Sequence, residues 1–326
     1  MSFIRRAFFY LLLISFFAPA CATVKPVAPP RKDFFPPGPK GDAYYHFLLA
    51  QLFQQSGNTD RAVHEYQQAL EKDKNSAFLH THLAALYLKK GFPEKALKEG
   101  EEAIRSDPKS VPAHLLLWGL YLSLNQREKA IQAYQETIQI DPRNQEARLF
   151  LGTLYAERRD YDKAVNHLKA LVSIDPRSLM GYYYLARVYA EMKRFDEAKS
   201  HYQTALSIKP NFEPALLDLA LIYEIQQEPE KAIQIYNNIL ASNPSSAEAH
   251  DRLGQVYIRQ KKLSEALNEF QAVEKLTINN SEVRTKIGLI YFEQGRLDEA
   301  IAQFVLVLSS QPDNDRVRYY LGTAYE

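Results

Sequence analysis

The amino-acid sequence predicts an all-α solenoid built from antiparallel helix pairs. A pattern of alanine, aromatic and leucine residues repeats every 34 residues, without insertion, from residue 43 to the end of the chain. Within each period the apolar positions follow helical spacing. At 326 residues the chain also exceeds the about 250–300 residues that one hydrophobic core serves, which favours a repeat array over a single domain.

Composition and charge exclude several classes of function. The 40 Lys and Arg residues balance 39 Asp and Glu residues, and the net charge of +1 gives no general attraction to nucleic acid. Hydrophobic residues make up 46% and charged residues 24%, so most of the chain is expected to fold. Glycine occurs only 12 times, too few for a loop-rich or phosphate-cradling fold. The one cysteine, Cys21, excludes internal disulfides and multi-cysteine metal sites.

Residues 1–20 are expected to be a signal peptide. Arg5 and Arg6 precede an uncharged, largely apolar run from residue 7 to residue 17. This run is shorter than the about 20 apolar residues that a membrane-spanning helix needs, and Pro19 follows it closely. An uncleaved membrane anchor is therefore the weaker interpretation.

The junction that follows resembles a bacterial lipobox, in which small residues precede a cysteine that is acylated and becomes the mature N-terminus. Here Ala18, Pro19 and Ala20 precede Cys21. Ala18 and Ala20 also satisfy the A-x-A cleavage rule, so a soluble periplasmic or secreted protein is the alternative. The lipobox resemblance implies a lipid anchor at Cys21 in the bacterial cell envelope. Ala22 resembles the signal for release to the outer membrane, where the protein would face the periplasm.

Residues 21–42 are expected to form a semi-rigid tether. Six prolines fall between residues 22 and 42, a density that argues against regular helix. Such a segment favours polyproline II at roughly 3.1 Å per residue, which would hold a folded body away from a membrane. Phe34 and Phe35 are interpreted as incidental to this spacer, with docking on the folded body or on a partner as the alternative.

Eight full units of 34 residues follow the tether. They are expected at 43–76, 77–110, 111–144, 145–178, 179–212, 213–246, 247–280 and 281–314, with residues 315–326 as the start of a ninth. Alanine recurs at Ala62, Ala96, Ala130, Ala164, Ala198, Ala232, Ala266 and Ala300. Each unit has an aromatic residue nine positions before this alanine, and Leu or Ile four positions before the aromatic, so the two share one helical face. Six units close with proline, where one helix ends and the next can begin.

These positions resemble the tetratricopeptide repeat, whose W-x2-L-G-x2-Y, A-x3-F and Pro positions are matched from residue 43 to residue 326. The resemblance implies a right-handed superhelical solenoid of antiparallel helix pairs. The glycine position of the family is occupied by Gly152, Gly254, Gly288 and Gly322. A small side chain there lets the two helix axes of a pair approach closely.

Four residues depart from the family pattern. Trp118 occupies the small-residue position of the third unit, which predicts a local adjustment of packing, with an exposed edge of the Trp ring as the alternative. Gly100 replaces the large second-helix residue in the second unit. Lys74 and Ile278 replace the closing proline of the first and seventh units, so looser joints are expected there.

No catalytic motif stands out, since the chain has no G-x-S-x-G elbow, no Gly-rich phosphate loop and no H-E-x-x-H. Histidine recurs at one unit position as His46, His80, His114 and His250. Ligands of one zinc ion lie about 2.0–2.1 Å from it, whereas equivalent positions on stacked helices are about 8–10 Å apart. We expect these histidines to pack, with a pH-responsive ridge as the alternative. We expect no metal, no cofactor, no catalytic residue and no small-molecule substrate.

The resemblance places the binding surface on the concave face, where the first helices receive extended peptides or helices. Carried over by position, the candidate groove residues are Phe47, Leu48, Leu115, Leu116, Leu149, Phe150, Tyr183, Tyr184, Leu217, Arg252 and Arg259. The groove would change from apolar and aromatic to charged along its length. This composition favours an amphipathic helix or an apolar peptide of a protein partner.

We therefore expect a non-catalytic protein–protein interaction scaffold tethered in the cell envelope. It resembles the tetratricopeptide lipoproteins that help assemble pili, insert outer-membrane proteins or export exopolysaccharide. The alternative is the substrate-recruiting arm of a larger enzyme whose catalytic domain lies beyond residue 326. This alternative rests on the chain ending at Glu326, partway through the first helix of the ninth unit, which suggests truncation.

Overall fold

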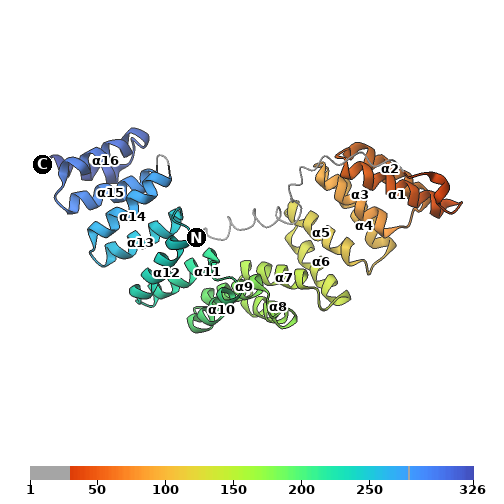
Figure 1. Cartoon of the computed structure of the whole chain (residues 1–326), viewed down its shortest axis with the longest axis horizontal. Helices are drawn as coiled ribbons and strands as arrows, with labels where there is room; N and C mark the ends of the chain where they lie inside the picture. Colours follow the sequence, from red (N-terminus) through yellow and green to blue (C-terminus); the bar gives the residue numbers. More distant parts are fainter. Residues whose placement is uncertain (1–29, 278–279) are drawn as a thin grey trace. The chain divides into compact units, whose positions relative to one another are not determined.

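The computed structural model describes residues 30–277 and 280–326, and within these ranges it contains 17 α-helices, one 3₁₀ helix and no β-strand (Figure 1). The predicted signal peptide, Cys21 and Ile278 lie outside the described residues. The first elements are η1 (Lys32–Phe34), α1 (Pro39–Gln55), α2 (Thr59–Lys72), α3 (Ala77–Lys89), α4 (Pro93–Ser106), α5 (Val111–Ser123), α6 (Arg127–Ile140), α7 (Gln145–Glu157) and α8 (Tyr161–Ile174). The others are α9 (Leu179–Glu191), α10 (Phe195–Ile208), α11 (Glu213–Ile225), α12 (Pro229–Ser242), α13 (Ala247–Arg259), α14 (Leu263–Leu276), α15 (Ser281–Glu293), α16 (Leu297–Ser310) and α17 (Asp315–Tyr325).

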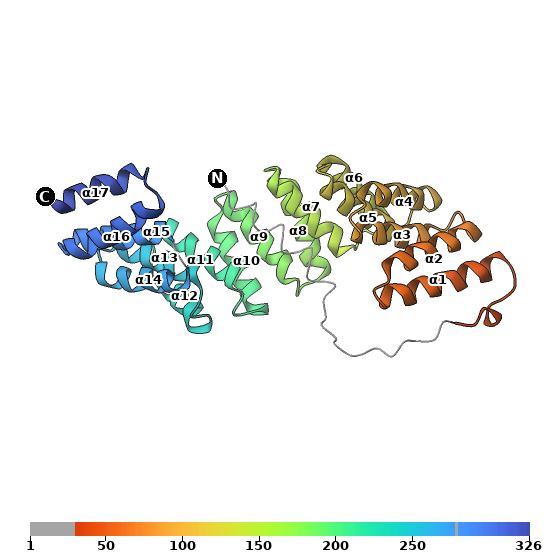
Figure 2. The same ribbon diagram turned by 90° about the horizontal axis from the view of Figure 1, so that it is seen from above.

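Consecutive helices pack as antiparallel pairs, beginning with α1 and α2 and continuing to α15 and α16 (Figure 2). From α3 onward, the first helix of every pair begins at the first residue of an expected unit. This is the all-α repeat solenoid that the sequence predicts. The described residues form two compact units, which we call the N-terminal unit (30–176, α1–α8) and the C-terminal unit (177–326, α9–α17). No helix in the described ranges is both long and apolar enough to cross a membrane.

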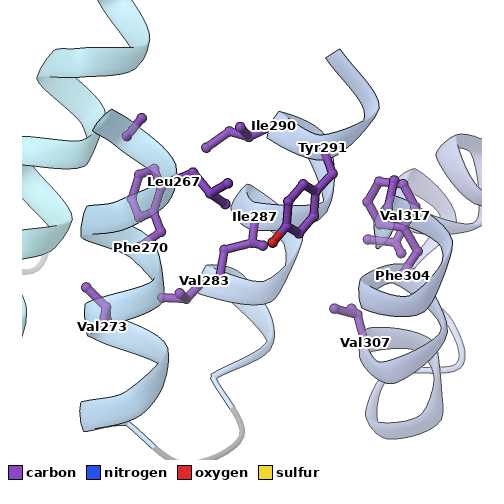
Figure 3. Packing of buried hydrophobic residues seen from close by; sticks show 12 residues of the cluster. Leu267, Phe270, Val273, Val283, Ile287, Ile290, Tyr291, Phe304, Val307 and Val317 are labelled. Carbon is purple, nitrogen blue, oxygen red and sulfur yellow. The ribbon is translucent and has the colours of Figure 1, made fainter. Parts of the chain in front are cut away.

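In three of the pairs, α7 with α8, α13 with α14 and α15 with α16, the core contains a contact between a glycine on the first helix and a large residue on the second. A Cβ atom added at Gly152 would lie 2.6 Å from Cγ of Leu168, and one added at Gly288 would lie 2.6 Å from Cε1 of Phe304. Figure 3 shows Phe304 pointing into a cluster that also contains Ile287 and Tyr291 of α15. The close approach predicted from the glycine position is confirmed.

In the second and third repeats, side chains of unusual size on one helix are compensated by side chains on a neighbouring helix. Gly100 of α4 leaves space that Leu117 of α5 fills, since a Cβ at Gly100 would lie 2.7 Å from Cδ2 of Leu117. Trp118 is 6% exposed, and its ring centroid lies 4.7 Å from that of Tyr134 and 4.6 Å from that of Phe150. The predicted packing adjustment at Trp118 is therefore confirmed.

Two expectations are wrong for the C-terminal end of the segment 21–42. Helix α1 begins at Pro39, inside the expected tether, because a proline in the first helical turn sacrifices no hydrogen bond. Phe35 is also not incidental, since its ring centroid lies 5.6 Å from Tyr44 and 5.8 Å from Tyr45. These edge-to-face contacts attach the end of the tether to the first helix.

The turn inside each complete pair contains one residue with a left-handed backbone at a fixed unit position. The residues are Gly57, Gly91, Asn125, Arg159, Lys193, Gln227, Lys261 and Gly295. The amide of the next residue donates to a carbonyl at the end of the first helix, as from Lys262 to Tyr257 at 2.9 Å. This bond terminates the first helix and fixes the direction of the second.

The substitution Lys261→Gly is expected to stabilise the protein by about 0.5–1 kcal/mol. The left-handed backbone of Lys261, with φ of 58°, is unfavourable for a residue with a side chain. Relief of this strain stabilises the folded state by more than the entropic cost of ordering a glycine from the unfolded chain. Urea unfolding monitored by circular dichroism measures the difference. The control is Lys262→Gly at the neighbouring residue, whose φ of −87° gives no such gain. Equal midpoints for the two variants would contradict this account of the turn.

Candidate functional site

The candidate groove residues of the N-terminal unit all lie on the first helices of their pairs. These residues lie on one side of the first helices, which we call the inner face. Its predicted members in this unit are half-buried, and they are Phe47, Leu48, Leu115, Leu116, Leu149 and Phe150. Helices α3 and α5 pack directly against each other, so inner-face residues of adjacent repeats lie side by side.

The first two repeats form an aromatic patch that the sequence analysis found only in part. The Phe47 ring centroid lies 5.2 Å from Phe78 and 6.1 Å from His82, and Phe78 lies 4.4 Å from His82. Phe78 and Tyr44 are each 54% exposed. Burial lowers the pKa of His82, so this imidazole is neutral near pH 7 and adds to the apolar character. Tyr44 lies three positions before Phe47, and Phe78 occupies the same position in the second unit. A comparison of this position across the units would have identified both residues.

Two buried polar atoms of the third repeat have no hydrogen-bond partner. The Tyr134 hydroxyl and Trp118 Nε1 are buried without a hydrogen bond. Corresponding tyrosines do have partners, because Tyr66 accepts from Gln51, Tyr202 donates to Asp218 and Tyr236 donates to Glu224. The three equivalent positions around Tyr134 are occupied by Gly119, Phe150 and Leu122. This stretch of the inner face is therefore apolar throughout.

In the C-terminal unit the predicted Tyr183 and Tyr184 belong to a mixed aromatic and charged cluster. The Arg187 guanidinium lies 5.7 Å from the Tyr183 ring centroid and 5.9 Å from that of Tyr184. Arg187 Nε lies 3.8 Å from Asp218 Oδ2, which also accepts from the Tyr202 hydroxyl at 3.1 Å. Burial raises the pKa of the Asp218 carboxyl, although the positive charge of Arg187 opposes this.

The remaining predicted residues lie on neighbouring helices of the same unit. Leu217 is half-buried and packs against the cluster around Tyr236. Arg259 forms an ion pair with Glu224, and the charge of Arg252 lowers the pKa of Asp218. The inner face therefore carries paired charges in the C-terminal unit. Whether any of these residues contacts a partner stays a prediction.

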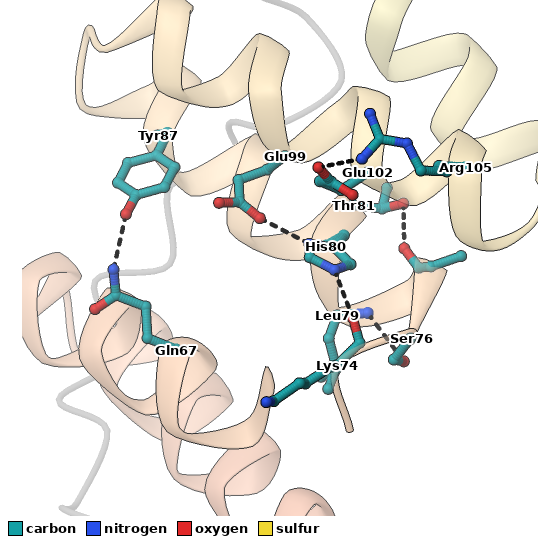
Figure 4. A network of polar contacts seen from close by, with 11 residues as sticks. Gln67, Lys74, Ser76, Leu79, His80, Thr81, Tyr87, Glu99, Glu102 and Arg105 are labelled. Atoms are coloured by element: carbon teal, nitrogen blue, oxygen red, sulfur yellow. Dashed lines mark hydrogen bonds and ion pairs between the residues drawn. The ribbon is translucent and has the colours of Figure 1, made fainter. Parts of the chain in front are cut away.

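The four recurring histidines bridge the two helices of their pairs by polar contacts. The Nδ1 atoms of three of them lie 2.6–2.7 Å from a glutamate on the second helix, in the pairs His46 with Glu65, His80 with Glu99 and His250 with Glu269. His80 Nε2 also donates to the Lys74 carbonyl at 3.0 Å, so the unit that lacks a closing proline is joined to the next (Figure 4). Among the described residues no group of three His, Cys, Asp or Glu side chains is placed to hold a metal ion.

Comparison with protein families decides what the repeats are. The model of the tetratricopeptide repeat protein 21 C-terminal ARM domain matches residues 147–321, and two tetratricopeptide repeat models match residues 47–111 and 119–144. The chain belongs to the tetratricopeptide repeat family. Tetratricopeptide repeats stack into extended surfaces that bind other proteins, so the chain is a protein–protein interaction scaffold.

Solved structures agree on the fold. A tetratricopeptide repeat protein from Parabacteroides merdae aligns with a TM-score of 0.55 at 16% identity, over 80% of this chain and 99% of that chain. The Cut9–Hcn1 hetero-tetramer of the APC/C aligns with a TM-score of 0.50 at 17% identity, over 90% of this chain and 58% of that chain. YrrB, a repeat protein with an unusual peptide-binding site, aligns with a TM-score of 0.47 at 24% identity, over 54% of this chain and 90% of that chain. The first two of these similarities show the fold alone, and no curated protein matches the chain.

The substitution His80→Gln is expected to destabilise the protein in a pH-dependent way. The Glu99 carboxylate raises the pKa of His80, so the histidine contributes stability that is complete below its ordinary pKa of 6.5 and is lost as pH rises through the raised value. We expect a loss of about 1 kcal/mol near pH 6 that shrinks above pH 8. Urea unfolding of the wild type and the variant across this range measures it.

His82→Gln is the matched control. Burial lowers the pKa of His82, so this histidine contributes stability that is complete above pH 6.5 and is lost as pH falls through the lowered value. The two variants should therefore show opposite pH trends. The same trend in both would contradict the role given to Glu99.

Proposed function

We propose that the scaffold is non-catalytic and binds an amphipathic helix or an apolar peptide of a protein partner on its inner face. The observation that carries the proposal is the apolar stretch over α1, α3, α5 and α7. It begins with the exposed rings of Tyr44 and Phe78 and continues through Leu116 to Phe150, below which Trp118 and Tyr134 have no polar partner. Exposed apolar surface of this kind is typical of a groove that receives the apolar face of a helix.

The inner face of the C-terminal unit, taken by itself, supports recognition of polar residues of a protein partner. Arg187 lies beside Asp218 at 3.8 Å, and Lys286 Nζ lies 2.6 Å from Asp251 Oδ1. Paired charges of both signs can exchange partners with a ligand at small cost, and they select against sequences that would leave one charge buried alone.

We further propose that the protein works in the bacterial cell envelope, anchored by lipid at Cys21 to the outer membrane and facing the periplasm. The support is the single cysteine after the small residues Ala18 to Ala20, at the end of the apolar run. A tethered scaffold suits an assembly or export factor that gathers components of pili, outer-membrane proteins or exopolysaccharide machinery.

Substitution of Phe78 by Asp is expected to reduce partner capture about tenfold or more, since it places a carboxylate in the aromatic patch. The 54% exposure of Phe78 means that the fold tolerates the change. Capture is measured by chemical cross-linking of the tagged full chain in envelope fractions, followed by quantitative mass spectrometry. Leu306→Asp is the control, because Leu306 is 44% exposed but lies on α16, the second helix of its pair. Unchanged capture by Phe78→Asp would contradict groove binding.

Cys21→Ser is expected to abolish incorporation of radiolabelled fatty acid and to release the protein from the membrane fraction. The thiol of Cys21 is the only one in the chain, so no other cysteine can replace it. Labelling of the wild type and the variant in a bacterial host, followed by fractionation, measures both effects. Membrane retention of an unlabelled wild type would favour the uncleaved anchor instead.

A further inference from the structure

A pocket of 290 Å³ lies between α4, α5 and α6 in the N-terminal unit. Its wall on α5 consists of residues 114, 117 and 121, which share one side of that helix. The inner-face residues 115, 116 and 119 point in other directions from the same helix. The pocket is therefore distinct from the proposed groove. Its volume is below that of typical pockets for drug-sized ligands and suits a single side chain.

In the two following repeats a histidine ring fills the corresponding space. In the fourth repeat the His167 ring stacks on Tyr155, with ring centroids 5.6 Å apart and planes 11° apart. In the fifth repeat His201 stacks on Tyr189 in the same way, at 5.4 Å and 10°. The equivalent tyrosine of the third repeat is Tyr121, but the equivalent of the histidine is Ala133.

The stacking partner of Tyr121 is thus missing while the rest of the arrangement is kept. Lys129 Nζ lies 5.4 Å from the Tyr121 ring centroid, as Lys163 Nζ lies 5.2 Å from that of Tyr155. Tyr121 is half-buried, whereas Tyr155 is only 5% exposed. The methyl group of Ala133 leaves room on Tyr121 for a planar group from another molecule.

The charge around the pocket favours a cation. Glu101 of α4 and Glu136 of α6 line it, and Lys129 and His114 are the basic groups beside them. His114 Nδ1 lies 3.2 Å from Glu136 Oε2, and Gln132 donates to Glu136 Oε1 at 2.9 Å, so the Glu136 carboxylate is held at the pocket. The pKa of Tyr121 is raised first by burial and then by the negative charges of Glu101 and Glu136.

We propose that this pocket binds an arginine side chain of a protein partner. The guanidinium stacks on the open face of Tyr121, in the place that imidazole takes in the next two repeats, and its N–H groups donate to the carboxylates of Glu101 and Glu136. Arginine fits better than lysine because its planar head stacks on an aromatic ring and can bond two acceptors at once. The two glutamates disfavour a phosphate or carboxylate ligand.

The test uses N-acetyl-L-arginine N-methylamide as the probe and the full chain labelled with ¹⁵N. Titration should shift the backbone amides of Tyr121 and Ala133 with millimolar affinity. The matched lysine probe should bind several-fold more weakly. Glu101→Gln combined with Glu136→Gln should weaken arginine binding about tenfold, because two charge-assisted hydrogen bonds are lost.

Three further variants test whether the pocket binds arginine specifically or is only an open space. Ala133→His should abolish binding by filling the space as His167 does, while Ala133→Ser, which leaves the space open, should bind like the wild type. His167→Ala should open the equivalent space on Tyr155, where Gln135 and Ala170 replace the two glutamates, and should not bind the probe. Absence of shifts in the wild type, equal binding of the lysine probe, or binding that survives Ala133→His would each overturn the proposal.

Discussion

The contact between a small residue on the first helix and a large residue on the second is the constraint on which every repeat depends. At Gly152 and Gly288 a single added carbon atom would overlap the opposing Leu168 or Phe304. Because the two helices of a pair are held at this separation, the first helices of successive repeats within one unit present equivalent positions on one side. The inner face is a consequence of that packing, and no local element creates it alone.

The third repeat shows what happens when the constraint is met in a different way. Gly100 removes volume from a second helix, Leu117 moves into the space, and Trp118 adds volume to the following first helix. On one side, Tyr134 and Trp118 have no polar partners beneath an apolar surface. On the other side, the small side chain of Ala133 leaves a pocket beside the half-buried Tyr121. Several separate departures from the regular pattern therefore alter both surfaces of the same repeat.

The sequence was sufficient for the features that depend on contacts inside one repeat or between adjacent ones. The helix pairs could be predicted because the 34-residue period reports them directly, and the packing adjustment at Trp118 because a large residue stands at a small-residue position. The start of α1 at Pro39 could not, because proline density argued against helix although a proline in the first turn is compatible with it. The ion pair of Arg187 with Asp218 and the stacking of His167 on Tyr155 depend on side-chain directions that spacing does not specify. A comparison of Ala133 with the same position in other units would have marked it as unusual, but not shown that a pocket results.

The most direct test of the scaffold account is site-specific photo-cross-linking in the intact cell envelope. A photoreactive phenylalanine analogue is placed at Leu116 on the inner face and, in a separate protein, at the exposed residue Asn166 on the second helix α8. The account predicts covalent adducts with a discrete partner from position 116 and none from position 166, with the cross-linked partner peptide being apolar or amphipathic. Adducts formed equally from both positions, or only from position 166, would contradict binding on the inner face.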